Sequence, residues 1–317
     1  MKTIFRFRIL LVFFLFLNLA SCQNDDGNDP QPKPEEPSVG YLINELPNNP
    51  DTLKIFAMGN SFTVDAMSNI PKILKEMGVN NVILGFVDYQ GCSLAQHYQN
   101  FTTDANPYAF FLDKAGTENW VITPSYTIKK ALQYTDWDII ILQQVSDDAG
   151  RYETFQPYLS SLLSELYKSS LNKNVVFGWH MTWAYGKNST HPGFKKYNNN
   201  QEQMYNSIVN TTKTLMKDTG IKLVIPSGTA IQNLRTSKID PSSLDLTRDG
   251  YHSNLAVGRY TLSYLWIEEL IVPCLNLDAS KVPYYSMDGN IPLSSNNYRT
   301  CQDAAEKALS KPFSISE

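Results

Sequence analysis

The sequence predicts an α/β fold: a three-layer α/β/α sandwich around a central, mostly parallel sheet of five strands, with an inserted β-hairpin. Two observations predict it. Short, nearly continuous apolar runs recur along the chain, and such runs are typical of parallel strands buried on both faces. Amphipathic stretches of helical length separate these runs. Strands that alternate with helices form βαβ units, which place helices on both faces of a parallel sheet.

The individual elements follow from this alternation. The apolar runs predict strands at Leu53–Met58, Asn81–Val87, Asp138–Leu142, Asn174–Phe177 and Lys222–Ile225. The amphipathic stretches predict helices at Asp65–Met77, Ser93–Asn100, Ser125–Tyr134, Tyr152–Lys168, Asn200–Asp218 and Asn254–Leu270. Two apolar arms on either side of Lys114–Thr117 predict the hairpin, within Tyr108–Thr123. The region after Cys274 is rich in Pro, Asn and Ser, so we expect it to wrap the domain and end in a short helix near Gln302–Leu309.

Composition is that of an ordinary globular protein. The chain has 317 residues, of which 42% are hydrophobic and 18% charged, enough for one large domain at 51–317. The net charge of −4 argues against nucleic acid as the main partner. We expect a monomer.

The N-terminus has the pattern of a signal peptide at 1–21. A basic start, "MKTIFRFR", precedes the apolar run "ILLVFFLFLNL", which is too short to span a bilayer. The following Leu19-Ala20-Ser21-Cys22 resembles the lipobox of bacterial lipoproteins, which implies a lipid on Cys22 that anchors the protein to a membrane. The alternative is an ordinary secretory signal with an incidental cysteine.

Residues 22–50 are dominated by Pro, Asp, Asn and Glu, and we expect a flexible polar tether. The expected location is the bacterial cell envelope, as an outer-membrane lipoprotein. The acidic run "QNDDGNDP" resembles the export signal of surface-displayed lipoproteins and favours exposure at the cell surface. Apart from Cys22, three cysteines remain, so at most one disulfide can form, and Cys274 and Cys301 are the expected pair if one exists.

A candidate nucleophile follows the first predicted strand. Ligands of an open α/β sheet bind beyond the carboxyl ends of its strands, and the turn Gly59-Asn60-Ser61 lies there. A serine at such a turn usually caps a helix, but it becomes a nucleophile when a base removes its proton. Asp249 and His252, in "LTRDGYHSNLAVGRY", are spaced so that the carboxylate can orient the imidazole and leave its other nitrogen facing a serine.

This combination resembles the SGNH (GDSL-like) hydrolases, which carry Gly-Asp-Ser after the first strand and Asp-x-x-His near the end. Asn60 stands in place of the Asp, while Ser61, Asp249 and His252 match. The resemblance implies a flavodoxin-like fold and a catalytic triad in which His252 is the base and Asp249 orients it. It also implies hydrolysis of ester bonds, often acetyl groups on carbohydrate. No cofactor or metal is expected.

The resemblance further implies an oxyanion hole. Its donors are the backbone N–H groups of Ser61 and of Gly91, in "DYQGCSL". Family members add an Asn after the third strand, which "DIIILQQVSDD" lacks, and the side-chain amide of Gln143 or Gln144 is the expected substitute. From Leu53 to Leu270 the chain also resembles a branch of these hydrolases known as a domain of unknown function, DUF4886.

The aromatic run after the fourth predicted strand and the function itself each allow two interpretations. The run "FGWHMTWAYG" places His180 and Trp183 after the fourth predicted strand, where with Asn60 they form a substrate pocket or, alternatively, pack in the core. His97 is expected on a helix face and His191 in solvent. The alternative to an esterase is a catalytically degenerate carbohydrate-binding surface lipoprotein, suggested by the missing Asn.

Overall fold

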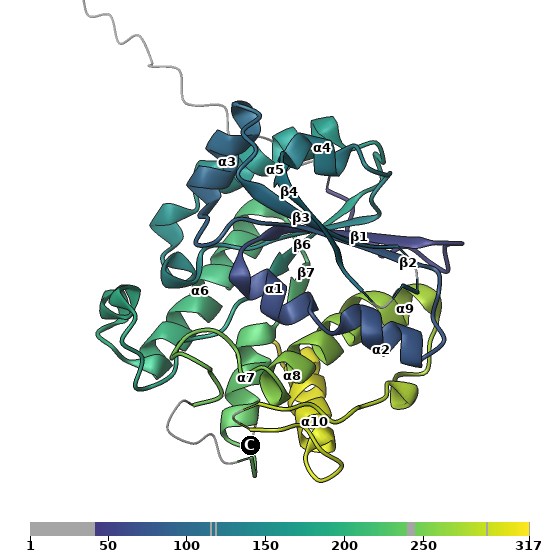
Figure 1. The fold of residues 1–317 in the computed structure, drawn as a ribbon. Helices are drawn as coiled ribbons and strands as arrows, with labels where there is room; N and C mark the ends of the chain where they lie inside the picture. Colours follow the sequence, from purple (N-terminus) through teal and green to yellow (C-terminus); the bar gives the residue numbers. More distant parts are fainter. Residues whose placement is uncertain (1–41, 115, 118, 240–244, 290, 317) are drawn as a thin grey trace, which may run out of the picture. The chain divides into compact units, whose positions relative to one another are not determined.

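The structure is a computed structural model that describes residues 42–114, 116–117, 119–239, 245–289 and 291–316 (Figure 1). The predicted signal peptide, Cys22 and most of the predicted tether lie outside these residues. Within the described ranges, no helix has both the length and the apolar character needed to cross a membrane.

A mixed sheet runs through the described part of the chain. Its seven strands are β1 (Leu53–Gly59), β2 (Val82–Asp88), β3 (Tyr108–Lys114), β4 (Val121–Tyr126), β5 (Ile139–Leu142), β6 (Val176–His180) and β7 (Leu223–Ile225). They lie in the order β4-β3-β2-β1-β5-β6-β7. The five predicted parallel strands are confirmed as β2, β1, β5, β6 and β7. The predicted hairpin, β3 and β4, pairs antiparallel with β2 and extends the sheet, which therefore has seven strands rather than five.

The order of the parallel strands is that of flavodoxin-like sheets. After β2 the chain returns to the opposite side of β1, where β5 pairs with it. The loops that leave the carboxyl ends of β1 and β5 therefore diverge, and such a topological switch point is where open α/β sheets bind ligands. Both strands are almost entirely buried, as expected for parallel strands covered on both faces.

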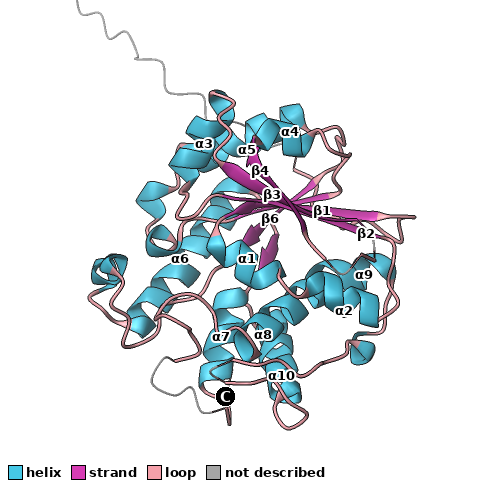
Figure 2. Ribbon diagram, viewed as in Figure 1, coloured by secondary structure: helices cyan, strands magenta, loops and turns pink. Residues whose placement is uncertain are grey.

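Helices cover the sheet on both faces. They are α1 (Ser61–Met67), α2 (Ile70–Glu76), α3 (Leu94–Thr102), α4 (Ile128–Leu132), α5 (Tyr158–Ser169), α6 (Gln201–Thr219), α7 (Ser227–Arg235), α8 (Val257–Trp266), α9 (Val272–Leu275) and α10 (Tyr298–Ser310). Figures 1 and 2 show α3, α4 and α5 above the sheet, and α1, α2 and α8 below it. Helices α7 and α10 pack on α8 and on each other, which completes the predicted three-layer sandwich.

Several predicted boundaries differ from the structure. The predicted helix Asp65–Met77 is divided between α1 and α2, because Pro71 stands in the first turn of α2. The predicted helix Tyr152–Lys168 begins with a 3-10 turn, and α5 starts only after Pro157. Helix α7 is not predicted, because its first residues, Ser227 and Gly228, are weak helix formers.

The fourth strand is also displaced from its predicted position. The sequence predicts it at 174–177, whereas β6 begins at Val176 and continues to His180. Trp179 and His180 therefore lie inside a central strand and not in the loop beyond it. Both side chains are almost fully buried.

Residues 42–50, assigned to the tether from their composition, pack on the domain. Ile43 forms an isolated bridge with Val176 of β6. Asn44 accepts a hydrogen bond through Oδ1 from the backbone N–H of Lys222 at 3.1 Å. The folded part of the chain thus begins earlier than predicted.

The three cysteines outside the N-terminal region are free and buried. Cys274 and Cys301, the expected pair if a disulfide exists, do not form one. Cys274 lies in α9 and Cys301 in α10, and each side chain is fully enclosed by the apolar core.

Candidate active site

Ser61 is the first residue of α1, directly after the turn that ends β1. Asn60, not Ser61, caps this helix: its Oδ1 accepts from the backbone N–H of Phe62 at 3.1 Å. Gly59 is required at the turn, because a Cβ there would lie 2.0 Å from the Thr63 hydroxyl oxygen. The serine hydroxyl is therefore free of the capping role that serines usually have at such turns.

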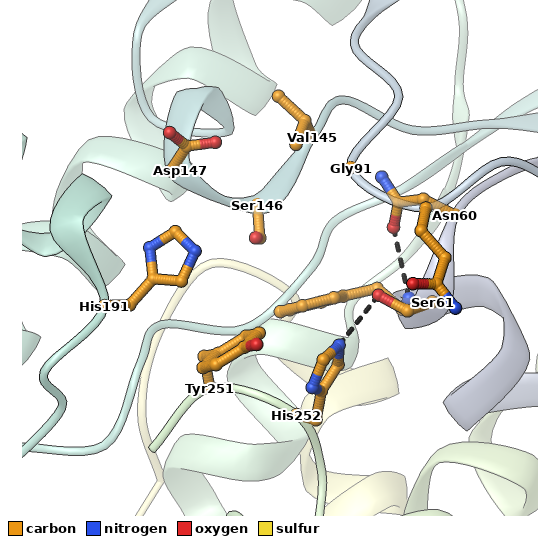
Figure 3. A pocket seen from close by; sticks show the side chains of 11 residues that line it. Asn60, Ser61, Gly91, Val145, Ser146, Asp147, His191, Tyr251 and His252 are labelled. Carbon is orange, nitrogen blue, oxygen red and sulfur yellow. Dashed lines mark hydrogen bonds between the residues drawn. The ribbon is translucent and has the colours of Figure 1, made fainter. Parts of the chain in front are cut away.

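Three predicted residues, Ser61, His252 and Asp249, come together at the carboxyl end of β1. Figure 3 shows the first two of them, joined by a hydrogen bond. The Ser61 Oγ lies 2.8 Å from Nε2 of His252, and the His252 Nδ1 lies 2.6 Å from Oδ2 of Asp249. A carboxylate can only accept, so Nδ1 carries the imidazole proton and donates to Asp249. Nε2 is then the acceptor for the Ser61 hydroxyl, which is the arrangement that a general base requires.

Asp249 is held in its ionised form. Burial by itself would raise the pKa of this carboxyl, but hydrogen bonds from the His252 side chain and from the backbone N–H groups of His252 and Tyr251 outweigh burial and lower the pKa. The carboxylate can therefore stabilise a positive charge on the His252 ring, because it stays negative where the imidazole gains a proton.

A buried ion cluster around Asp65 ties the segment of His252 to α1, the helix of Ser61. Asp65, one turn after Ser61 on α1, is fully buried and accepts from Arg248 at 2.8 and 2.9 Å. Arg259 of α8 donates to the same carboxylate at 2.7 and 2.9 Å, and so does the backbone N–H of Ser253 at 2.9 Å. Arg248 and Ser253 flank the segment that carries Asp249 and His252. The Asp65 carboxylate thus fixes the Arg248–Ser253 segment against α1.

Two backbone N–H groups are available to stabilise an oxyanion. Ser61 and Gly91 both line the cavity, and neither backbone N–H has a partner among the hydrogen bonds of the described residues. Gly91 has a φ of 67°, a left-handed conformation that favours glycine and orients its N–H. These are the two backbone donors that the sequence predicts.

The predicted third donor does not lie in the cavity. Gln143 is buried, with its Nε2 donating to Asn60 Oδ1 at 2.8 Å and its Oε1 accepting from Thr63 at 2.7 Å. Gln144 is also buried, and its amide is bonded to the backbone N–H of Leu94 and to Thr154. Both amides turn inward, where buried polar groups need partners. Contrary to expectation, neither is placed to act as an oxyanion donor.

His180 and Trp183 lie beneath the cavity and do not line it, contrary to the pocket prediction. His180 is hydrogen-bonded through Nδ1 to Gln143 and through Nε2 to the Ser227 hydroxyl, each at 2.9 Å. Burial lowers the pKa of His180 to about 3. Trp183 stacks on Phe62 with a centroid separation of 4.2 Å and supports the cavity floor.

His97 lies on α3 as predicted, but its side chain is fully buried and bonded to the Tyr108 hydroxyl at 2.9 Å. His191, expected in solvent, instead lines the cavity. Its Nδ1 accepts from the backbone N–H of Gly193 at 3.1 Å, which caps a 3-10 helix at Pro192–Tyr197.

The cavity holds about 340 Å³, the size of a small-molecule site. Its lining combines the predicted Asn60, Ser61, Gly91 and His252 with Phe62, Gln90, Val145, Ser146, Asp147, His191 and Tyr251. The position of Ser146 and Asp147 just after β5 is the one signal that could have identified them, because they lie at the switch point. Across the described residues, no group of three or more His, Cys, Asp or Glu side chains is arranged to hold a metal ion.

Several solved structures are similar to this chain to different degrees. A crystal structure of a DUF4886 family protein from Bacteroides uniformis is 36% identical, with a TM-score of 0.76, and the match covers 84% of this chain and 98% of that one. A variant of an acetyl-xylooligosaccharide esterase from Geobacillus is 11% identical, with a TM-score of 0.45, over 76% of this chain and all of that one. A GDSL-like lipase from Bacteroides thetaiotaomicron is 12% identical, with a TM-score of 0.41, over 70% and 87%.

Among curated proteins, none matches this chain. The family model described as "Domain of unknown function (DUF4886)" matches residues 54–288, which include every residue of the candidate active site. Together with the Bacteroides uniformis structure, this match confirms the branch that the sequence predicts. The chain belongs to the DUF4886 family.

Proposed function

We propose that this protein is a serine hydrolase that cleaves ester bonds of acetyl or other short acyl groups. The observation that carries the proposal is the continuous chain of hydrogen bonds from Ser61 through His252 to Asp249, at 2.8 and 2.6 Å. The sequence resemblance to SGNH hydrolases supports it. A protein that only binds a ligand has no need for this alignment.

The proposed reaction begins with Ser61. Its Oγ attacks the acyl carbonyl carbon while its proton passes to Nε2 of His252, and Asp249 stabilises the resulting imidazolium. The backbone N–H groups of Ser61 and Gly91 donate to the oxyanion, each contributing about 3 kcal/mol to the transition state. His252 returns the proton to the leaving alcohol, and the same base then activates the water that releases the acid.

The test uses 4-nitrophenyl acetate and the Ser61→Ala variant. We expect kcat/KM to fall by about 10⁴-fold or more, because the nucleophile is lost, with an unchanged unfolding midpoint. Ser170→Ala is the matched control, since it removes a buried serine hydroxyl that donates to the backbone carbonyl of Leu166 outside the cavity. Ester hydrolysis that survives Ser61→Ala would refute the mechanism. A wild-type protein inactive on acetate, propionate and butyrate esters would favour the carbohydrate-binding alternative.

We also propose that the mature protein is a monomeric lipoprotein of the outer membrane, attached through Cys22. The signal-peptide pattern and the small residues before Cys22 support this proposal. Metabolic labelling with a radioactive fatty acid should mark the wild-type protein and not Cys22→Ser. Protease treatment of intact cells should then degrade the domain if it faces the outside.

A further inference from the structure

The wall of the cavity opposite Ser61 carries polar groups that the proposed reaction does not use. Figure 3 shows Asp147 and His191 across the cavity from Ser61 and His252, with Tyr251 between the two histidines. The ring centroid of Tyr251 lies 4.2 Å from that of His252 and 4.7 Å from that of His191. The cavity thus continues from the nucleophile along an aromatic ring to a second polar cluster.

His191 presents a donor of fixed identity. Its Nδ1 accepts from the backbone N–H of Gly193, so the neutral ring carries its proton on Nε2. Burial lowers the pKa of His191, which favours this neutral form. Nε2 has no hydrogen-bond partner within the described part of the chain. The ring therefore offers an N–H donor beside the cavity.

Asp147 presents an acceptor next to this donor. Its Oδ2 accepts from Lys196 at 2.6 Å, while Oδ1 has no partner among the bonds found in the described ranges. Lys196 pairs with both Asp147 and Asp148, and Arg151 also pairs with Asp148. The two cations offset the two carboxylates, so these four side chains have no excess charge with which to select a cation. A Cβ on Gly193 would lie 2.3 Å from the Cβ of Asp147, so the backbone at Gly193 packs directly on Asp147 and fixes it.

A donor, an acceptor and an aromatic face in one cavity suit a neutral molecule with several hydroxyl groups on a compact ring. An alkyl chain would desolvate Asp147 and His191 without satisfying either group. We propose that Asp147, His191 and Tyr251 form a carbohydrate subsite that binds the alcohol part of the ester, with ring hydroxyls bonded to Asp147 and His191 and a sugar face on Tyr251. The identity of the bond that is cleaved rests on the proposed function, whereas the binding of the sugar does not.

The test compares two substrates, a monoacetylated methyl glucoside and 4-nitrophenyl acetate. We expect the ratio of their kcat/KM values to fall at least tenfold in Asp147→Asn and in His191→Asn. Asparagine is a good helix cap, so the second variant keeps the bond to Gly193 while it removes the Nε2 donor. Asp148→Asn is the matched control, because Asp148 also pairs with Lys196, at 2.8 Å, but does not line the cavity. Unfolding midpoints show whether each variant folds.

A ratio that is unchanged in both variants overturns the subsite, and so does an equal fall in Asp148→Asn. A binding measurement separates this inference from the proposed function. The same glucoside is titrated against Ser61→Ala, with and without Asp147→Asn, and ligand NMR signals report its dissociation constant. A tenfold weaker constant supports the subsite even where wild type hydrolyses no ester. Absence of binding to Ser61→Ala overturns the subsite while leaving hydrolysis of 4-nitrophenyl acetate as the separate test of the enzyme.

Discussion

Two serine–histidine pairs in this molecule have nearly the same geometry and different surroundings. In the cavity, His252 joins the Ser61 hydroxyl to the Asp249 carboxylate. Beneath it, His180 joins the Ser227 hydroxyl to the Gln143 amide, with both bonds at 2.9 Å. The second pair differs in its third member, which is neutral, and in its burial, because His180 and Ser227 are enclosed by protein.

Under the proposed mechanism, the short distance from a serine to a histidine is not enough to make that serine a nucleophile. A neutral amide cannot stabilise the imidazolium that forms when a serine loses its proton, and burial makes that cation still less favourable at His180. At His252, the Asp249 carboxylate supplies the negative charge, and the opening to the cavity reduces the cost of burying the cation. Gln143, the partner of His180, bonds to both Asn60 and Thr63. The buried network therefore holds the turn that carries Ser61.

The largest effect should come from making the active pair resemble the buried one. Asp249→Asn replaces the carboxylate with an amide, and we expect kcat on 4-nitrophenyl acetate to fall by about 10⁴-fold, because the imidazole loses its tautomer and its counter-charge. Steady-state kinetics at pH 7 measure the change. A loss of less than tenfold would show that the carboxylate is not what separates the two pairs.

The converse change, Gln143→Glu, gives the buried pair a carboxylate. We expect it to lower the free energy of unfolding by about 3–5 kcal/mol, because a buried charge would face the Oδ1 of Asn60 without a full set of donors. Urea denaturation measures this cost. Gln99→Glu, at an exposed position of α3, is the control and should change stability by less than about 0.5 kcal/mol. Equal stabilities would contradict the account of the buried network.

The pH dependence of stability should reveal the buried histidine. The folded-state pKa of His180 is lowered to about 3, below its unfolded value, so the unfolded chain binds the proton first as the pH falls. The contribution of neutral His180 to the free energy of unfolding is complete above about pH 6.5. It is lost as the pH falls toward 3, at about 1.4 kcal/mol per pH unit. Urea denaturation at pH 6.5 and 5.0 should therefore show a smaller decline in His180→Gln than in wild type. Parallel declines would contradict the assigned burial.

The smallest effect concerns the backbone of the cavity. Gly91→Ala should cost about 1–2 kcal/mol of stability, because alanine is strained at the positive φ of this residue even though its Cβ meets open space. Gly78→Ala is the matched control, with a φ of 71° and the same open surroundings. Both variants should lose similar stability by thermal denaturation, but only Gly91→Ala should slow ester hydrolysis. Equal hydrolysis rates in both would argue against an oxyanion donor at Gly91.

Local patterns explain which parts of the fold could be predicted. The parallel strands are continuous apolar runs, and the base and its carboxylate lie three residues apart, so both are visible in short windows of sequence. The hairpin was predicted but its pairing with β2 was not, since pairing is set by packing between distant segments. Helix α7 starts with residues of low helix propensity and is formed by its packing on α8 and α10.

The sequence likewise predicts one wall of the candidate site and not the other. Ser61, Asp249 and His252 belong to recognisable motifs. The opposite wall is assembled from Asp147, in a 3-10 helix after β5, and His191, which precedes a different 3-10 helix after β6. His191 sits in the polar run "KNSTHPGF", which resembles a solvated loop, and its role as a cap depends on folded backbone geometry. The inward direction of Gln143 depends on Asn60 and Thr63, some 80 residues earlier in the chain.

The buried ion cluster of Asp65, Arg248 and Arg259 determines which segments must separate together in local unfolding. Its carboxylate joins α1, α8 and the segment from Arg248 to Ser253, so none of the three can detach without exposing a buried charge. The amide proton of Ser253, bonded to Asp65, is therefore released to exchange with solvent only by an opening that separates these elements together. Ser61 and His252 consequently belong to one cooperative unit of local unfolding.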